Sequence, residues 1–327
     1  MPPRANQGRH WIDDLMKQRI NTVTGLIAAE RLGVTLGHEH VLISGGGIKQ
    51  EFAFLFDYRK TLERVIHELR LAKAGGIDTI LDLTTVDLGR DVELYAEASR
   101  QSGMNVVATT GFWLNPPLTF RDRPPDFFAD LFIHEIVNGI AGTGIKPGLI
   151  KISNDIGGVT PEAEIIIRGA ARACNATGIP ISTHQWAPEQ VGARQLEILL
   201  DEGVRPQHIC IGHSADTTDI EYLVSLLQAG VFLSMDRYPG REGRPDWRTR
   251  NATVKALIDR GFADRLMLGH DYAPRPVIAG EKPELNSSTP YLFLSETAIP
   301  ALRASGVGDD VIQTMLVDAP RRFLSGD

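Results

Sequence analysis

Gly33-Val-Thr-Leu-Gly-His-Glu-His40 is a short, largely apolar stretch with a polar end, a composition typical of a buried β-strand that leads into a functional site. In a strand, successive side chains project from opposite faces, so His38 and His40 share one face and Glu39 faces the other way. Two imidazoles on one face suit a single metal ion, whereas a lone buried histidine is more often hydrogen-bonded within a core. The rest of the chain decides between these interpretations.

Around this stretch, short apolar runs alternate with longer amphipathic segments, which is the pattern of βα units in a parallel sheet. Eight strands, each followed by a helical pattern, predict an α/β fold with a single (β/α)8 TIM barrel, and a doubly wound open sheet is the alternative. A short β arm at 20–25 precedes the barrel, and two C-terminal helices are expected at 290–305 and 309–324. The predicted strands are 34–40, 79–83, 106–110, 149–152, 179–183, 209–212, 231–235 and 266–269.

The composition limits the class of protein. With 327 residues, 43% hydrophobic content and no linker, the chain is expected to form one domain over 20–327, after a polar extension at 1–19. A net charge of -7 gives no basic surface for nucleic acid or an anionic membrane. The extension lacks the apolar core of a secretory signal, and Cys174 and Cys210 show no disulfide framework, so a cytoplasmic protein is expected.

Polar residues are few at the predicted carboxyl ends of the strands, where a TIM barrel places its active site. Histidine and aspartate are standard metal ligands, so their convergence at one mouth predicts a metal centre rather than a core histidine. His270, one residue before the last ligand candidate, is expected to point out of the barrel. The candidates are His38, His40, Lys151, His184, His213 and Asp271.

Lys151 differs from the other candidates because an ammonium group cannot bind a metal, and a lysine in a barrel core is costly without a partner. One interpretation is a lysine paired with a carboxylate. The other is that burial and neighbouring cations lower its pKa, so that the neutral amine takes up carbon dioxide. The carbamate would be an anionic oxygen ligand able to bridge two metals.

These motifs together resemble the phosphotriesterase-like branch of the amidohydrolase superfamily, over about 20–324. The resemblance implies a binuclear (β/α)8 hydrolase that acts on a small-molecule ester and forms a homodimer. The matching motifs are Gly33-Val-Thr-Leu-Gly-His-Glu-His40, Gly148-Leu-Ile-Lys-Ile152, Ser182-Thr-His184, Ile211-Gly-His-Ser214 and Gly269-His-Asp-Tyr272.

The resemblance also assigns the metal ligands. It implies that His38, His40 and Asp271 hold one divalent ion and that His184 and His213 hold the other. Carboxylated Lys151 and a hydroxide would bridge the two ions, which are zinc, or manganese, cobalt or iron. Such a pair lowers the pKa of water and polarises the substrate oxygen.

Two aspartates are candidates for proton transfer. Asp271, a ligand that would also touch the hydroxide, is the expected proton acceptor. Asp216 matches the family's carboxylate in a proton path away from Asp271, and a helix N-cap before 218–229 is its alternative.

The predicted substrate pocket has a mixed signature. Met235-Asp-Arg-Tyr-Pro239 resembles the lactonases, because phosphotriesterases have a histidine where this chain has Arg237. Gly111-Phe-Trp-Leu-Asn-Pro-Pro117 resembles the phosphotriesterase loop, with Trp113 where lactonases usually have a tyrosine. Trp113, Arg237 and Tyr238 are therefore candidate pocket residues, and Arg237 is expected to pair with a carboxylate such as Asp216. The signature favours a lactone or carboxylic ester, with promiscuous phosphotriesterase activity.

Three alternatives stay open at this point. The first is a genuine phosphotriesterase. A TatD-like nuclease also begins with a His-X-His motif, but it is expected to have glutamate at Lys151 and a basic surface. A non-catalytic barrel that keeps a single metal would have no turnover to lose on substitution of Asp271.

Overall fold

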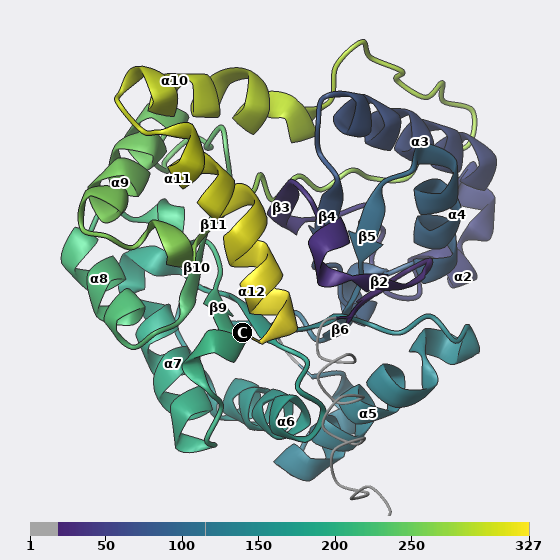
Figure 1. Cartoon of the computed structure of the whole chain (residues 1–327). Coiled ribbons are helices and arrows are strands. Elements are labelled where there is room, and N and C mark those ends of the chain that lie inside the picture. The colour runs from purple at the N-terminus through teal and green to yellow at the C-terminus, as the bar shows by residue number, and fades with distance from the viewer. Residues whose placement is uncertain (1–18, 115, 327) are drawn as a thin grey trace, which may run out of the picture.

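A closed ring of parallel strands, surrounded by helices, forms the centre of the computed structural model, which describes residues 19–114 and 116–326 (Figure 1). The strands are β3 (Thr35–Glu39), β4 (Thr79–Asp82), β5 (Asn105–Val107), β6 (Thr109–Gly111), β7 (Leu149–Ser153), β8 (Ile181–His184), β9 (Ile209–Ile211), β10 (Phe232–Met235) and β11 (Leu266–Leu268).

Two sheets, β3-β4-β5 and β6 to β11, join into one barrel. β5 and β6 follow each other along the chain, and the intervening Ala108 accepts a hydrogen bond from the amide of Gly148 (2.9 Å), so the two segments act as one strand. At the other seam, the amide of Asp271 donates to the carbonyl of His38 (2.9 Å). The predicted TIM barrel is therefore confirmed, and the open doubly wound sheet is wrong.

Helices alternate with the strands and pack outside them (Figure 1). Their ends follow the sequence closely: Asp57 caps α3 (Tyr58–Ala74) through the amide of Lys60 (3.0 Å), and Gly103 and Gly178 end α4 (Val92–Ser102) and α6 (Pro161–Thr177) in the left-handed conformation. The helices are α2 (Ile48–Glu51), α3 (Tyr58–Ala74), α4 (Val92–Ser102), α5 (Pro125–Asn138), α6 (Pro161–Thr177), α7 (Val191–Asp201), α8 (Ile220–Gln228), α9 (Trp247–Asp259), α10 (Ile299–Ala304), α11 (Asp309–Gln313) and α12 (Ala319–Ser325).

The barrel interior is apolar at its amino-terminal end. Leu81, Leu149 and Phe232 pack there, and this end is covered by the predicted arm, a hairpin of β1 (Arg19–Thr22) and β2 (Gly25–Ala28), together with α12. Because side chains alternate along a strand, residues two and four positions further on also face the interior, nearer the carboxyl end. The polar site residues occupy these positions.

A bulge in β3 lies between Leu36 and Glu39, where the register with β4 shifts by one residue. Leu36 packs in the outer core beneath the helices, whereas His38, two residues later, meets interior side chains. A bulge adds one residue to a strand and so changes which face the following side chains occupy. This bulge therefore directs His38 and His40 into the barrel.

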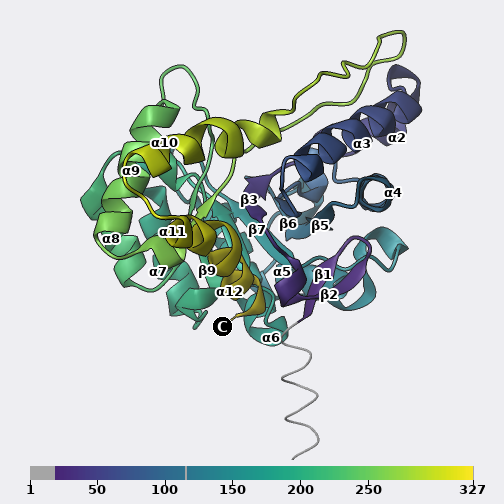
Figure 2. The same cartoon turned by 45° about the horizontal axis from the view of Figure 1, so that its top comes forward.

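The segment 272–289 after β11 runs beside α3 in two views of the molecule (Figures 1 and 2). Its backbone is bound to the start of α3 and to the preceding turn: the amide of Asp57 donates to Val277, and the amide of Ala279 donates to Leu55, at 2.9 and 2.8 Å. The wall that this segment forms beside the strand ends is therefore held by main-chain hydrogen bonds.

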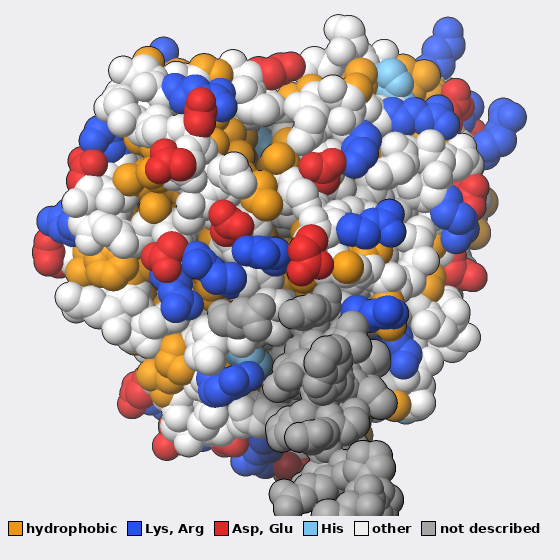
Figure 3. Space-filling model, viewed as in Figure 1, with side chains coloured by type: hydrophobic (Ala, Val, Ile, Leu, Met, Phe, Trp, Pro, Cys, Tyr) orange, Lys and Arg blue, Asp and Glu red, His pale blue; other side chains and the backbone are white. Residues whose placement is uncertain are grey.

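Basic and acidic side chains are interspersed on the face that carries α12 (Figure 3). The described residues that are visible on this face form no continuous basic patch of the kind that binds nucleic acid. Within the described ranges, no helix is both long and apolar enough to cross a bilayer. The predicted polar extension at 1–19 lies outside the described residues except for Arg19, which begins β1.

We expect Gly111→Ala to destabilise the chain by about 2 kcal/mol more than Gly25→Ala, because overpacking a tight contact costs roughly that amount. Both glycines have nearly the same positive φ, 119° and 117°. A Cβ on Gly111 would overlap the carbonyl oxygen of Lys151, whereas one on Gly25 meets open space. Calorimetric Tm values of the metal-free variants measure the difference, and equal Tm values would show that the β6–β7 contact has room for a methyl group.

Candidate metal centre

The first group of candidate ligands brings together β3 and the end of β11. The Nε2 atoms of His40 and His38 lie 3.2 and 3.6 Å from Oδ1 of Asp271, and all three residues are buried. Their ligand atoms are close enough to share one cation. Two imidazoles and a carboxylate are ligands that zinc and similar divalent metals accept.

The second group lies directly beside the first. Nε2 of His213, after β9, is 2.8 Å from Nδ1 of His184, at the end of β8. Nζ of Lys151, on β7, lies 3.2 Å from Nε2 of His38 and donates to the carbonyl of Thr183 (3.0 Å). The structure therefore brings all six predicted ligand residues to one end of the barrel interior.

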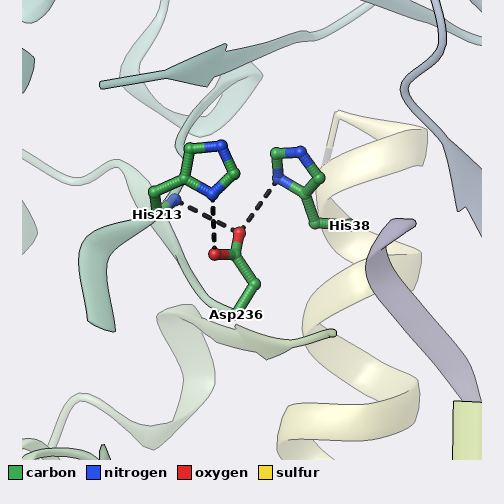
Figure 4. Close-up of side chains that lie close together, drawn as sticks. All are labelled: His38, His213 and Asp236. Carbon is green, nitrogen blue, oxygen red and sulfur yellow. Dashed lines mark hydrogen bonds and ion pairs between the residues drawn. The ribbon is translucent and has the colours of Figure 1, made fainter. Parts of the chain in front are cut away.

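Asp236, which follows β10, holds imidazoles from both groups in place. Its carboxylate lies between them, with Oδ1 2.8 Å from Nδ1 of His213 and Oδ2 3.0 Å from Nδ1 of His38 (Figure 4). Ser234 donates a further hydrogen bond to Oδ2 (2.7 Å). A carboxylate on Nδ1 leaves the lone pair of Nε2 free to bind a metal, which is the usual arrangement around ligand histidines.

Histidine tautomers test whether a metal fits the first group. Thr84 donates to Oδ2 of Asp82 (3.2 Å), so its hydroxyl oxygen accepts the Nδ1 proton of His40 (2.9 Å). The lone pair of His40 Nε2 then faces the carboxylate oxygen of Asp271 at 3.2 Å. Two acceptors this close repel each other unless a cation lies between them, so the donor set fits a metal ion.

A similar argument holds for the second group. Nε2 of His184 is buried without a hydrogen bond and has Oδ2 of Asp155 as its nearest partner at 3.4 Å. A proton on Nε2 would face this carboxylate and leave the lone pair of Nδ1 directed at His213. The two lone pairs at 2.8 Å again fit a shared cation.

Burial sets the charge of the nitrogen ligands. Burial, helped by Lys151, lowers the pKa of His38 to about 4, and burial lowers the pKa values of His184 and His213 as well. Neutral imidazole is the form that binds metals. Burial also lowers the pKa of Lys151 to about 7, so a neutral amine is accessible near neutral pH.

Lys151 makes no hydrogen bond to a carboxylate among the described residues; its polar partners there are His38 and the carbonyl of Thr183. The interpretation of Lys151 as one half of a direct salt bridge is therefore wrong. Burial opposes the charged form of Lys151, and the carboxylates of Asp271 and Asp236 offset this effect only in part.

Arg237 links the metal centre to Asp216. Its Nε donates to Oδ2 of Asp271 (2.9 Å) and its Nη1 donates to Oδ2 of Asp216 (2.6 Å). Asp216 also accepts from Arg244 and from Arg250 (2.7 Å to Arg250). The predicted pair of Arg237 with Asp216 is thus present, with two further arginines that the sequence did not indicate.

The alternative role of Asp216, as the N-cap of the following helix, is wrong. Asp219 caps α8 by accepting a hydrogen bond from the amide of Tyr222 (3.0 Å). Asp216 instead lies in a short turn that is buried against three guanidinium groups. Asp216 lies three residues after His213 and before the first residue of α8, so it is not part of that helix.

The backbone is left-handed at three site residues: φ is 55° at His213, 66° at Arg237 and 52° at Asp271. Non-glycine residues in this region are strained and concentrate at functional sites. Each of the three residues lies two or three positions after the end of a strand, namely β9, β10 or β11. These left-handed turns therefore contribute to the orientation of the three side chains at the site.

The predicted pocket residues lie around this centre. The half-buried ring of Trp113 stands edge-on to His184, with ring centroids 6.3 Å apart. Tyr238 is buried, and its hydroxyl donates to Asn251 (2.9 Å), so only its ring contributes to the neighbouring cleft. His270 binds Glu39 through Nδ1 (2.7 Å) and the amide of Leu294 through Nε2 (3.1 Å), which excludes both nitrogens from the metal groups.

The model of the Phosphotriesterase family matches residues 18–324. This chain belongs to the phosphotriesterase family. An aryldialkylphosphatase of Saccharolobus solfataricus is 36% identical over 305 residues, which cover 91% of this chain and 97% of the relative. A phosphotriesterase homology protein of Mycobacterium tuberculosis is 37% identical over 325 residues, covering 93% and 97%. An N-acetyltaurine hydrolase of Dictyostelium discoideum is 24% identical over 367 residues, covering 94% and 98%.

In this phosphotriesterase-family chain, we expect Asp236→Asn to weaken metal affinity by about 10- to 100-fold, the usual effect of losing a carboxylate behind a ligand histidine. Either amide orientation would place an NH2 group opposite a donor. Chelator competition and elemental analysis measure the loss. Asp219→Asn, the same change at the α8 cap, is the control. Equal affinities in two folded variants would contradict the role of Asp236.

Proposed function

We propose that this chain is a binuclear metal-dependent hydrolase that cleaves lactones or other carboxylic esters and has promiscuous phosphotriesterase activity. The observation that carries the proposal is the convergence of His38, Lys151, His184, His213 and Asp271, with His40, inside one end of the barrel. Membership of the phosphotriesterase family supports hydrolysis.

In this proposal His38, His40 and Asp271 hold one divalent ion, zinc or manganese, cobalt or iron, and His184 and His213 hold the second. Lys151, carboxylated on Nζ by carbon dioxide, would supply a further anionic oxygen ligand. When bound, such a pair supplies a nucleophile from water at neutral pH and polarises the substrate oxygen. The burial of Lys151 supports the modification, because burial favours loss of the ammonium charge.

Asp271 is the proposed proton acceptor. The pKa of Asp271 lies well below its usual value although burial opposes this effect, and the charge of Arg237 contributes to the lowering, so the carboxylate is ionised. Arg237 holds Oδ2 at 2.9 Å, which leaves Oδ1 facing the two histidines. Asp216 would act through Arg237, by fixing the guanidinium that orients Asp271.

Arg237 also supports the choice of a carboxylic ester over a phosphotriester. A guanidinium that bridges two carboxylates stays protonated and cannot relay a proton as a histidine would. The alternative, a genuine phosphotriesterase, is supported by the edge-on Trp113 beside His184 and by the relative named aryldialkylphosphatase.

Side-by-side kinetics separate the two functions. With enzyme that carries about two metals per chain and was prepared with bicarbonate, kcat/KM for γ- and δ-lactones should exceed that for an aryl dialkyl phosphate by about 100-fold, or roughly 2.7 kcal/mol in barrier. The reverse preference would establish the phosphotriesterase instead. Full loading without either activity would contradict the proposal, and N-acetyltaurine would then be the amide to test.

Asp271→Ala is the control for these measurements, because any activity that survives in it arises outside the proposed site. Loss of turnover also separates an enzyme from a barrel that only binds metal. A basic nuclease is disfavoured by the acidic chain and by Lys151.

We also propose a homodimer, formed through an apolar patch on α2 and the turn after it. Phe54 is 75% exposed, and its neighbours Ile48, Phe52 and Leu55 are exposed as well. Clustered exposed apolar side chains of this size are typical of interfaces. The proposed partner is a second copy of the chain.

Phe54→Glu should convert this dimer into a monomer, because a charge would be buried against the partner's apolar patch. Light scattering after size exclusion should give twice the 35.9 kDa chain mass for the parent and the single mass for the variant. Val137→Glu, at an exposed apolar position on α5, should remain dimeric. A monomeric parent protein would contradict the assembly.

The cytoplasm is the proposed location, supported by two free, buried cysteines in place of a disulfide.

A further inference from the structure

A cleft of about 510 Å3 opens directly beside Asp271, between the segments that follow β10 and β11. Arg237, Arg241 and Arg275 line it, together with Ile43, Tyr238 and Pro290. We call this site the arginine cleft. It is large enough for a small organic molecule, and its combination of guanidinium groups with apolar walls suits a ligand that has one charged group and a short carbon skeleton.

The charges of the arginine cleft are unbalanced. Asp271 is the acidic residue among its described lining residues, and its carboxylate is already bound by Arg237. The side chain of Arg241 is 60% exposed, and its Nη2 reaches no closer than 4.0 Å to Oδ2 of Asp271. The guanidinium of Arg275 has no hydrogen bond or ion pair with any residue in the part of the chain that the structure describes.

This arrangement differs from that of arginines that stabilise the surface. Arg168, for example, lies within 2.9 Å of carboxylate oxygens of Glu164, Asp201 and Glu202. The chain as a whole carries a charge of -7, so free guanidinium groups that gather at one concave site create a local positive field against the overall charge. Such a field attracts anions and focuses them at the cleft.

We propose that the arginine cleft binds a carboxylate carried by the substrate, so that the natural substrate is an anionic lactone or ester. The proposal rests on the hydrolytic function proposed above and names its substrate class. Guanidinium groups bind carboxylates through paired hydrogen bonds, and Arg241 and Arg275 are free to do so. Arg241 comes within 4.0 Å of Asp271, at the proposed site of hydrolysis. A substrate carboxylate bound to Arg241 would therefore lie only a few bonds from the scissile carbonyl. Water adds to the lactone carbonyl and the ring acyl C–O bond breaks, which gives a hydroxy dicarboxylate and releases one proton; the carboxylate held by the arginines is unchanged.

A matched pair of γ-lactones tests the substrate class: 5-oxotetrahydrofuran-2-carboxylate and its neutral N,N-dimethylamide. The parent enzyme should prefer the anion by about tenfold in kcat/KM, the effect of a hydrogen bond to a charged group. In the double variant Arg241→Gln, Arg275→Gln this ratio should fall towards one, mainly through KM for the anion. Arg59→Gln, which removes the same charge from an exposed helix position, should keep the ratio of the parent.

A binding measurement keeps this proposal testable apart from catalysis. Tetrahydrofuran-2-carboxylate has no scissile bond, and calorimetry should give a Kd about tenfold higher for the double variant than for the parent or Arg59→Gln. If neither lactone is hydrolysed but this Kd difference is present, the proposed hydrolysis fails and the arginine cleft stands. An equal Kd in all three proteins, or a lactone ratio that the double variant leaves unchanged, would overturn the role of the two arginines.

Discussion

The carboxylate of Asp236 is the contact on which the site depends, because it fixes imidazoles from opposite parts of the barrel at the same time. Its two oxygens hold the Nδ1 atoms of His38 and His213 at 3.0 and 2.8 Å, and its carbonyl accepts from Arg250 (2.9 Å). A buried carboxylate needs such donors to offset its lost hydration. One charged group therefore contacts a histidine on β3 and a histidine that follows β9, and it helps to set the positions of these two candidate metal ligands.

Much of this arrangement could be predicted because it follows from local pattern. The alternation of apolar runs and amphipathic segments predicts the barrel, and most strand boundaries lie within two residues of the structure. Parity along a strand places Lys151 on the same face as Leu149, which packs in the interior. Even so, the bulge that directs His38 inward carries no clear sequence signal, because it depends on the register between β3 and β4.

The contacts that the sequence did not reveal are those that join distant segments. Asp236 directly follows β10, so the strand-end rule applies to it, but its contact with two imidazoles depends on the spacing of three strands. The same holds for Arg250, which lies in the first turn of α9, is fully buried and donates to Asp216. Local composition gives the residue type at such a position, whereas the partner is set by tertiary packing.

The shared carboxylate of Asp216 has a consequence for how this enzyme could change over evolution. Arg237 from a strand end and Arg244 from a loop both donate to Oδ2 of this carboxylate, and Arg250 from α9 donates to Oδ1. Replacing any one of them alters the charge balance felt by the other two, so the effects of substitutions here will not add. New specificities that involve Arg237 will therefore depend strongly on genetic background, and the order in which mutations arise will restrict the accessible paths.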